Sequence, residues 1–79
     1  MSRNEPKNAV KQYEAAVNLK PKYSLYRYKY GQALAKSGQS EKAITQYQKV
    51  IEIDKDSELD KQAQIEIEKL KNGSSQLLQ

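Results

Sequence analysis

The sequence predicts an all-α fold of about four helices arranged as antiparallel hairpins, and three observations lead to it. Apolar residues recur at the three-to-four-residue spacing of an amphipathic helix in successive segments. Short runs that favour turns separate these segments. The apolar pattern of the first segment also recurs at an offset of 34 residues, a period typical of helix-turn-helix repeats.

The first helix is expected at about residues 5–19. Its apolar residues lie on one stripe of a helix, namely Ala9, Val10, Tyr13, Ala16, Val17 and Leu19. Pro6 suits the first turn of a helix. Pro21 ends the segment, because a proline disfavours the helical conformation of the residue before it.

The second helix is expected at residues 24–37, although its tyrosines alternate as they would in a strand. Four of the six tyrosines lie close together, at Tyr23, Tyr26, Tyr28 and Tyr30. The segment continues without a break into residues 31–36, which favour a helix, so we reject the strand. Ser24 is a candidate N-cap, and Gly38 after Ser37 provides a stop.

The third and fourth helices are expected at residues 40–54 and 58–71. The third carries the apolar residues Ala43, Ile44, Tyr47, Val50, Ile51 and Ile53. The fourth carries Leu59, Ala63, Ile67 and Leu70 on one face, with Ile65 beside it. Residues 72–75, Asn-Gly-Ser-Ser, are expected to end it. The prediction is therefore a single helical domain at 1–72 and a flexible C-terminal tail at 73–79.

Composition excludes several classes of function. The 79 residues carry 14 basic and 10 acidic side chains, a net charge of +4, and no cysteine or histidine. Disulfides and Cys/His metal sites are therefore excluded, and no serine lies in a nucleophile or phosphate-binding motif. We expect no enzyme activity, no catalytic residue, no metal and no cofactor. With no apolar segment long enough for a membrane and no signal-peptide core, a cytoplasmic protein is predicted.

The internal repeat is the most specific signal. Adding 34 to each apolar position of the first segment gives an apolar residue every time, from Ala9 and Ala43 to Leu19 and Ile53, and Gln12 matches Gln46. Small residues at Ala16, Gly31 and Ala43 indicate closely approaching helices, and Tyr13 and Tyr47 are large where a hairpin leaves a gap.

These residues resemble the tetratricopeptide repeat family over about residues 7–72. Residues 24–57 read as one complete unit, similar to the family pattern at Tyr30-Gly31, Leu34, Gly38, Ala43, Tyr47 and Val50, with Pro21 at the usual proline of the preceding unit. Arg27 stands where the family usually has tryptophan, and Lys55 replaces its proline. The resemblance implies a short right-handed α-solenoid that acts as a non-catalytic protein-protein interaction module and a scaffold for assembly.

The resemblance also implies a binding groove, lined mainly by the first helix of each unit. The corresponding residues are Tyr23, Leu25, Tyr28, Lys29, Gln32 and Lys36, followed by Leu59, Gln62 and Glu66 in the last helix. Residues 25, 28, 32 and 36 share a helical face by spacing alone. Tyr26 and Tyr30 are expected in the core, whereas Tyr23 and Tyr28 fit either the groove or an idle surface. The family's clamp for C-terminal carboxylates is not expected, because its Lys, Asn and Arg are missing.

The frame of the repeat suggests a second function. The sequence begins with the second helix of one unit and ends with the first helix of another. We hypothesise self-association, in which half-repeats complete each other between chains. The alternative is a fragment whose neighbouring helices lie in a longer protein.

Charge suggests the kind of partner. Residues 1–36 carry a net charge of +6 and the remainder −2. A basic, tyrosine-bearing surface suits an acidic peptide or, as a further alternative, nucleic acid. The simplest interpretation of the charge is a solvated helix face. The carboxylates between Glu52 and Asp60 lack the glycine-centred spacing of a calcium loop and are interpreted as an acidic turn.

Overall fold

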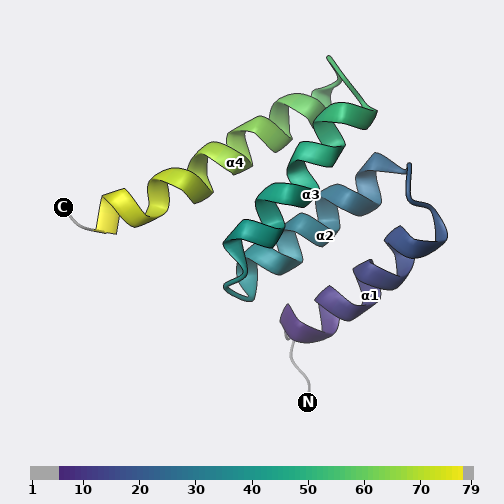
Figure 1. The fold of residues 1–79 in the computed structure, drawn as a ribbon, viewed down its shortest axis with the longest axis horizontal. Coiled ribbons are helices and arrows are strands. Elements are labelled where there is room, and N and C mark those ends of the chain that lie inside the picture. The colour runs from purple at the N-terminus through teal and green to yellow at the C-terminus, as the bar shows by residue number, and fades with distance from the viewer. Residues whose placement is uncertain (1–5, 78–79) are drawn as a thin grey trace.

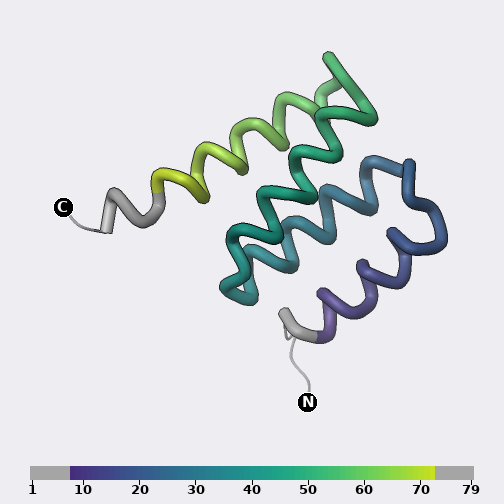
Figure 2. Tube along the Cα trace, viewed as in Figure 1, coloured from purple at the N-terminus to yellow at the C-terminus, as the bar shows by residue number. Residues whose placement is uncertain are grey.

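The computed structural model describes the backbone of residues 6–77 and the side chains of residues 8–72. It contains α1 (Pro6–Leu19), α2 (Ser24–Lys36), α3 (Ser40–Ile53) and α4 (Glu58–Leu77), joined by short turns (Figure 1). The path of the chain places α1 and α4 on opposite sides of the α2–α3 hairpin (Figure 2). Helix α2 contacts α1, α3 and α4, and α4 also packs on α3. The molecule is flat, with extents of 41 × 40 × 17 Å, and the predicted all-α helical-repeat fold is confirmed.

The ends of the helices agree with the prediction except at the C-terminus. The predicted N-cap of α2 is wrong, because Tyr23 takes that position and the Ser24 hydroxyl donates to Asp54 instead. The ends of α1, α2 and α3 lie within one residue of the expected positions, while residue 5 lies outside the described residues. The predicted end of the fourth helix at residue 71 is wrong, because α4 continues to Leu77 through the Asn-Gly-Ser-Ser segment. Glycine costs only about 1 kcal/mol relative to alanine inside a helix, and it keeps its backbone N–H, so an existing helix can propagate through it. The predicted tail at 73–79 is thus helical as far as Leu77.

The α2–α3 turn is fixed by backbone hydrogen bonds and one glycine. The N–H of Gln39 donates to the carbonyl of Leu34 at 2.9 Å, and that of Gly38 donates to Ala35 at 3.1 Å. This is the Schellman arrangement, which needs a left-handed residue just after the helix. Gly38 fills that position with a φ of 87°. Glycine adopts this conformation without a steric penalty, so the predicted stop is confirmed.

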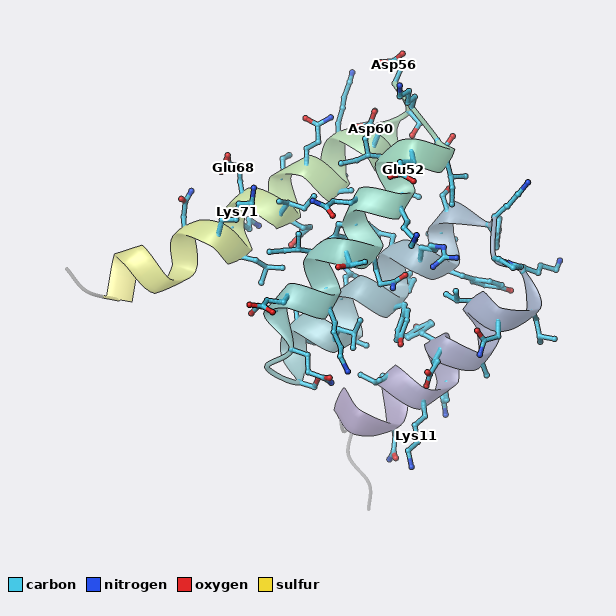
Figure 3. All side chains as sticks on the ribbon, viewed as in Figure 1. Lys11, Glu52, Asp56, Asp60, Glu68 and Lys71 are labelled. Atoms are coloured by element: carbon cyan, nitrogen blue, oxygen red, sulfur yellow. The ribbon has the colours of Figure 1, made fainter. Side chains whose placement is uncertain are left out.

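The α3–α4 turn is held by side chains. The Oγ of Ser57 accepts the N–H of Asp60 at 3.0 Å, which makes Ser57 the N-cap of α4. The carboxylate of Asp60 accepts the backbone N–H of Asp56 at 2.6 Å and the side-chain amide of Gln64 at 2.7 Å. Figure 3 shows Asp56 and Asp60 together at this turn. One carboxylate of the predicted acidic turn, that of Asp60, therefore joins the turn to the first residues of α4.

The core lies between α2, α3 and α4. It consists of Leu34, Ala43, Tyr47, Val50 and Ala63, each at most 2% exposed. Around it pack half-buried apolar side chains, which include Leu59, Ile67 and Leu70 of α4. The predicted stripe of α4 is thus the face that it buries, and Ile65 beside it is 46% exposed.

Gly31 lets α2 and α3 approach closely. A Cβ atom at Gly31 would lie 2.8 Å from Cε1 of Tyr47, closer than real Cβ contacts come. The ring of Tyr47 therefore occupies the space that any larger residue at position 31 would need. This contact explains why the sequence pairs a small residue in α2 with a large one in α3.

Candidate interaction surface

One face of α2 carries most of the predicted groove residues. Leu25, Lys29 and Lys36 are exposed on this face, and Tyr28 and Gln32 are half-buried. Spacing places all five on the same side of the helix. Tyr23, just before α2, is 47% exposed, and Leu25 is 39% exposed. The N-terminal end of α2 thus presents two large apolar side chains, with two lysines further along the same face.

Tyr28 links this face to α4. Its hydroxyl donates to Oε2 of Glu66 across a long distance of 3.4 Å, and its ring lies 5.5 Å from the ring of Tyr47. Burial, followed by the nearby Glu66 carboxylate, raises the pKa of Tyr28 above its usual value. Tyr28 is therefore only partly open to a ligand, since it packs against the core and donates to Glu66 of α4.

The three predicted groove residues of α4, Leu59, Gln62 and Glu66, have different surroundings. Leu59 is half-buried and packs against the core, whereas Gln62 is exposed. The structure therefore leaves Gln62 open to a ligand, with Glu66 half-buried one turn further along α4. The spacing of groove positions alone could not separate these cases, because Leu59 also belongs to the apolar stripe of its helix.

The remaining tyrosines of α2 differ in their contacts, because Tyr30 packs against the core cluster and Tyr26, which was expected in the core, does not. Tyr26 is half-buried and its ring meets that of Tyr23 edge to face, at a centroid distance of 4.5 Å. Tyr30 packs against the core, which confirms its expected role. Burial and then the carboxylate of Glu14 in α1 raise the pKa of Tyr30. Tyr23 is thus held by Tyr26 in an exposed position where an aromatic ring can contact a partner.

Arg27 joins three segments, and sequence reasoning missed this role. Its Nε donates to the carbonyl of Pro21 at 2.9 Å, and its Nη1 donates to Oε1 of Gln46 at 2.9 Å. The guanidinium thus connects the α1–α2 turn to α3 from the position where the resembled family has tryptophan. The recurrence of glutamine at positions 12 and 46 draws attention to Gln46, but it does not indicate Arg27 as its partner.

The described residues contain no group of three or more potential ligand side chains placed to hold a metal ion. The acidic residues of the α3–α4 turn instead make hydrogen bonds within the fold. Besides the bonds that Asp60 accepts at the turn, the carboxylate of Asp54 accepts a hydrogen bond from Ser24 Oγ of α2 at 3.1 Å. In the part of the chain that the structure covers, no helix is both long and apolar enough to span a bilayer.

Comparison with known proteins identifies the central hairpin. Residues 24–57 match the family model described as tetratricopeptide repeat, so the matched unit contains α2, α3 and the turn after each of them. No curated protein and no solved structure matches the chain.

Proposed function

We propose that this chain, a tetratricopeptide-repeat protein whose complete unit spans residues 24–57, is a non-catalytic module that binds a segment of another protein on the α2 face. Repeats of this kind act in protein-protein interaction, and stacked helices provide the extended surface that such binding uses. The proposed binding residues are Tyr23, Leu25, Tyr28, Lys29, Gln32 and Lys36, with Gln62 and, at the buried edge, Leu59 from α4.

One observation carries the proposal. Helix α2 contacts all three other helices, yet it leaves Leu25 39% exposed, with Tyr23 47% exposed beside its first turn. Large apolar side chains of this kind, and tyrosine in particular, anchor protein interfaces. Their neighbours on the helix are charged or polar, as in the rim of an interface.

The charges on this face favour an acidic partner. Lys29 and Lys36 are both exposed and lie two turns apart on the same side of α2. The half-buried carboxylate of Glu66 already contacts the Tyr28 hydroxyl. An acidic segment with one leucine or aromatic side chain therefore fits best, with its apolar residue against Leu25 and its carboxylates near the lysines.

The test uses a panel of short, fluorescently labelled peptides, each with several Asp or Glu residues and one Leu or aromatic residue. Fluorescence anisotropy at moderate salt selects the tightest one. Its affinity is then measured for the Lys29→Glu/Lys36→Glu variant. We expect affinity to fall by about tenfold or more, because two favourable charge contacts become repulsive.

A matched control separates a specific site from general charge. The variant Lys11→Glu/Lys49→Glu changes the net charge equally at exposed positions of α1 and α3, and Lys11 points away from α2 (Figure 3). We expect this control to keep most of the affinity. Equal losses in the two variants, or no binding by any peptide, would contradict the proposed face.

The two alternatives stay predictions with distinct outcomes. Self-association through half-repeats predicts a molecular mass that rises with concentration. A nucleic-acid function predicts that single-stranded oligonucleotides bind better than the peptides, with an affinity that falls steeply with salt. The proposed cytoplasmic location fits an interaction module and is tested by imaging of a tagged chain.

A further inference from the structure

Helix α1 leaves uncovered a face that its repeat counterpart buries. In α3, Ala43, Tyr47 and Val50 are at most 1% exposed. The residues 34 positions earlier in α1, Ala9, Tyr13 and Ala16, are only half-buried. The difference arises because α3 packs between α2 and α4, whereas α1, among the residues that the structure describes, packs on α2 alone.

The α2–α3 hairpin indicates what a helix must offer in order to cover this kind of face. Gly31 leaves room for the Tyr47 ring, and Leu34, 2% exposed, belongs to the same core cluster as Ala43 and Val50. At the edge, Arg27 donates to Gln46, and Ser24 donates to Asp54. Four residues of α2 therefore provide a large part of its packing and hydrogen bonding against α3.

The corresponding residues of α1 fit a covering helix that is similar to α2. That helix differs from α2 in one charge, at the position of Ser24. Tyr13 stands at the position of Tyr47, and Gln12, which is exposed, stands at that of Gln46. A covering helix therefore needs a small residue against Tyr13 and a basic residue near Gln12. Lys20 is exposed at the position of Asp54, so an acidic side chain in place of Ser24 completes the match.

Helix α4 of a second copy meets only two of these four requirements. It carries the acidic Glu58 and the basic Lys61 at the positions of Ser24 and Arg27, but Ile65 and Glu68 at those of Gly31 and Leu34. Since even a Cβ atom at position 31 would be 2.8 Å from the tyrosine ring, an isoleucine there cannot take the same place. Glu68 lies on the side of α4 that faces away from α3 (Figure 3), and regular pairing would bury its carboxylate without a partner.

We propose that the uncovered face of α1 (Ala9, Gln12, Tyr13 and Ala16, with Lys20 at its end) is a second interaction surface, which binds an amphipathic helix of another protein. That helix carries an acidic, a basic, a small and a large apolar residue at the spacing of Ser24, Arg27, Gly31 and Leu34. It packs against α1 as α2 packs against α3.

The test uses two synthetic peptides of equal length as probes. One copies residues 22–38 with Ser24→Glu, and the other copies residues 56–72 of α4. Each is added without label to the isotopically labelled full chain, and amide shifts are followed by NMR, which detects weak binding. We expect the first peptide to shift the signals of Ala9, Gln12, Tyr13 and Ala16, and the α4 peptide to leave them unchanged.

Two pairs of variants locate the peptide on the chain. Ala16→Arg blocks the face, whereas Ala15→Arg puts the same side chain on the exposed neighbouring position. We expect the first to weaken binding by about tenfold or more and the second to leave it nearly unchanged. Gln12→Lys is expected to weaken binding, and Arg27→Glu in the peptide is expected to restore it, a rescue that a loss of folding could not produce.

Three outcomes would overturn the proposal. The first is the absence of any shift on α1, and the second is equal loss of binding in Ala15→Arg and Ala16→Arg. The third is equal binding of the α4 peptide, which would identify a second copy of this chain as the occupant. The proposed α2 surface is tested with different peptides and variants, so either surface can fail without the other.

Discussion

Gly31 and Tyr47 set the distance between the two helices of the complete repeat. A Cβ atom at Gly31 would lie 2.8 Å from Cε1 and 3.0 Å from Cζ of Tyr47. Tyr47 is 1% exposed and is surrounded by the core. The small Gly31 and the large Tyr47 therefore allow α2 and α3 to pack closely. This hairpin supports both proposed surfaces.

The substitution Gly31→Ala is expected to lower the free energy of unfolding by about 1–2 kcal/mol, because the cost of overpacking exceeds the roughly 1 kcal/mol gained in helix propensity. Urea denaturation followed by circular dichroism measures the change. In the Tyr47→Leu background the same substitution is expected to cost less, since the ring is gone. Equal costs in both backgrounds would show that the close contact is not the cause.

Leu34→Ala is expected to destabilise the chain by about 2–5 kcal/mol, through the lost apolar contacts and the cavity left in the core. Leu34 is 2% exposed, whereas Leu19 is 82% exposed and serves as the matched control. Leu19→Ala is expected to change stability by no more than about 0.5 kcal/mol. A short chain has little stability to lose, so Leu34→Ala is expected to lower the thermal midpoint severely. Similar midpoints for Leu34→Ala and Leu19→Ala would contradict the placement of Leu34 in the core.

Arg27→Met keeps the aliphatic stem but removes both hydrogen bonds, to Pro21 and to Gln46. We expect the free energy of unfolding to fall by about 1–2 kcal/mol. This is less than two buried charge-assisted hydrogen bonds would contribute, because one of the two is exposed. Gln46→Ala removes one bond and is expected to cost less. A double-mutant cycle measures their coupling, and strictly additive losses would argue against the contact.

Acid is expected to destabilise the fold partly through Asp60. The hydrogen bonds from the side chain of Gln64 and the backbone of Asp56 hold the pKa of Asp60 below its ordinary value of 3.8. A carboxyl with a lowered folded-state pKa contributes stability above the unfolded value and loses it as the pH falls through the folded one. Denaturation midpoints measured from neutral pH into the acid range should therefore fall.

Two variants isolate this contribution. Asp60→Asn is expected to be less stable than the unchanged chain at neutral pH. Its denaturation midpoint is expected to depend less on pH in the acid range. Glu52→Gln removes an exposed carboxylate and is expected to keep the dependence of the unchanged chain. The same acid profile in Asp60→Asn as in the unchanged chain would exclude Asp60 as a source of the effect.

The sequence predicts the helices well where local signals agree with packing. The stop at Ser37-Gly38 and the stripe from Leu59 to Leu70 depend on the conformation of glycine and on helical periodicity, and both are confirmed. The end of α4 was not predicted, because turn-favouring residues at 72–75 only weaken a helix and do not block its hydrogen bonds.

The surfaces were harder to predict than the fold. The resemblance predicts Tyr28 and Leu59 as groove residues, and the structure adds a contact of each with the core that no local pattern indicates. The bridge made by Arg27 depends on a carbonyl and an amide from other segments, which no local pattern contains. The uncovered face of α1 becomes clear only when the exposure of its residues is compared with that of their repeat counterparts.

The central claim is that the α1 and α4 ends of two copies do not complete each other, so that the proposed surfaces stay open to other proteins. Sedimentation equilibrium over a wide concentration range, with helicity measured on the same dilutions, tests this claim most directly. The account predicts a helical monomer of 9.1 kDa at every concentration. A mass that rises with concentration, together with helix loss on dilution, would contradict it and would indicate that half-repeats complete each other between chains.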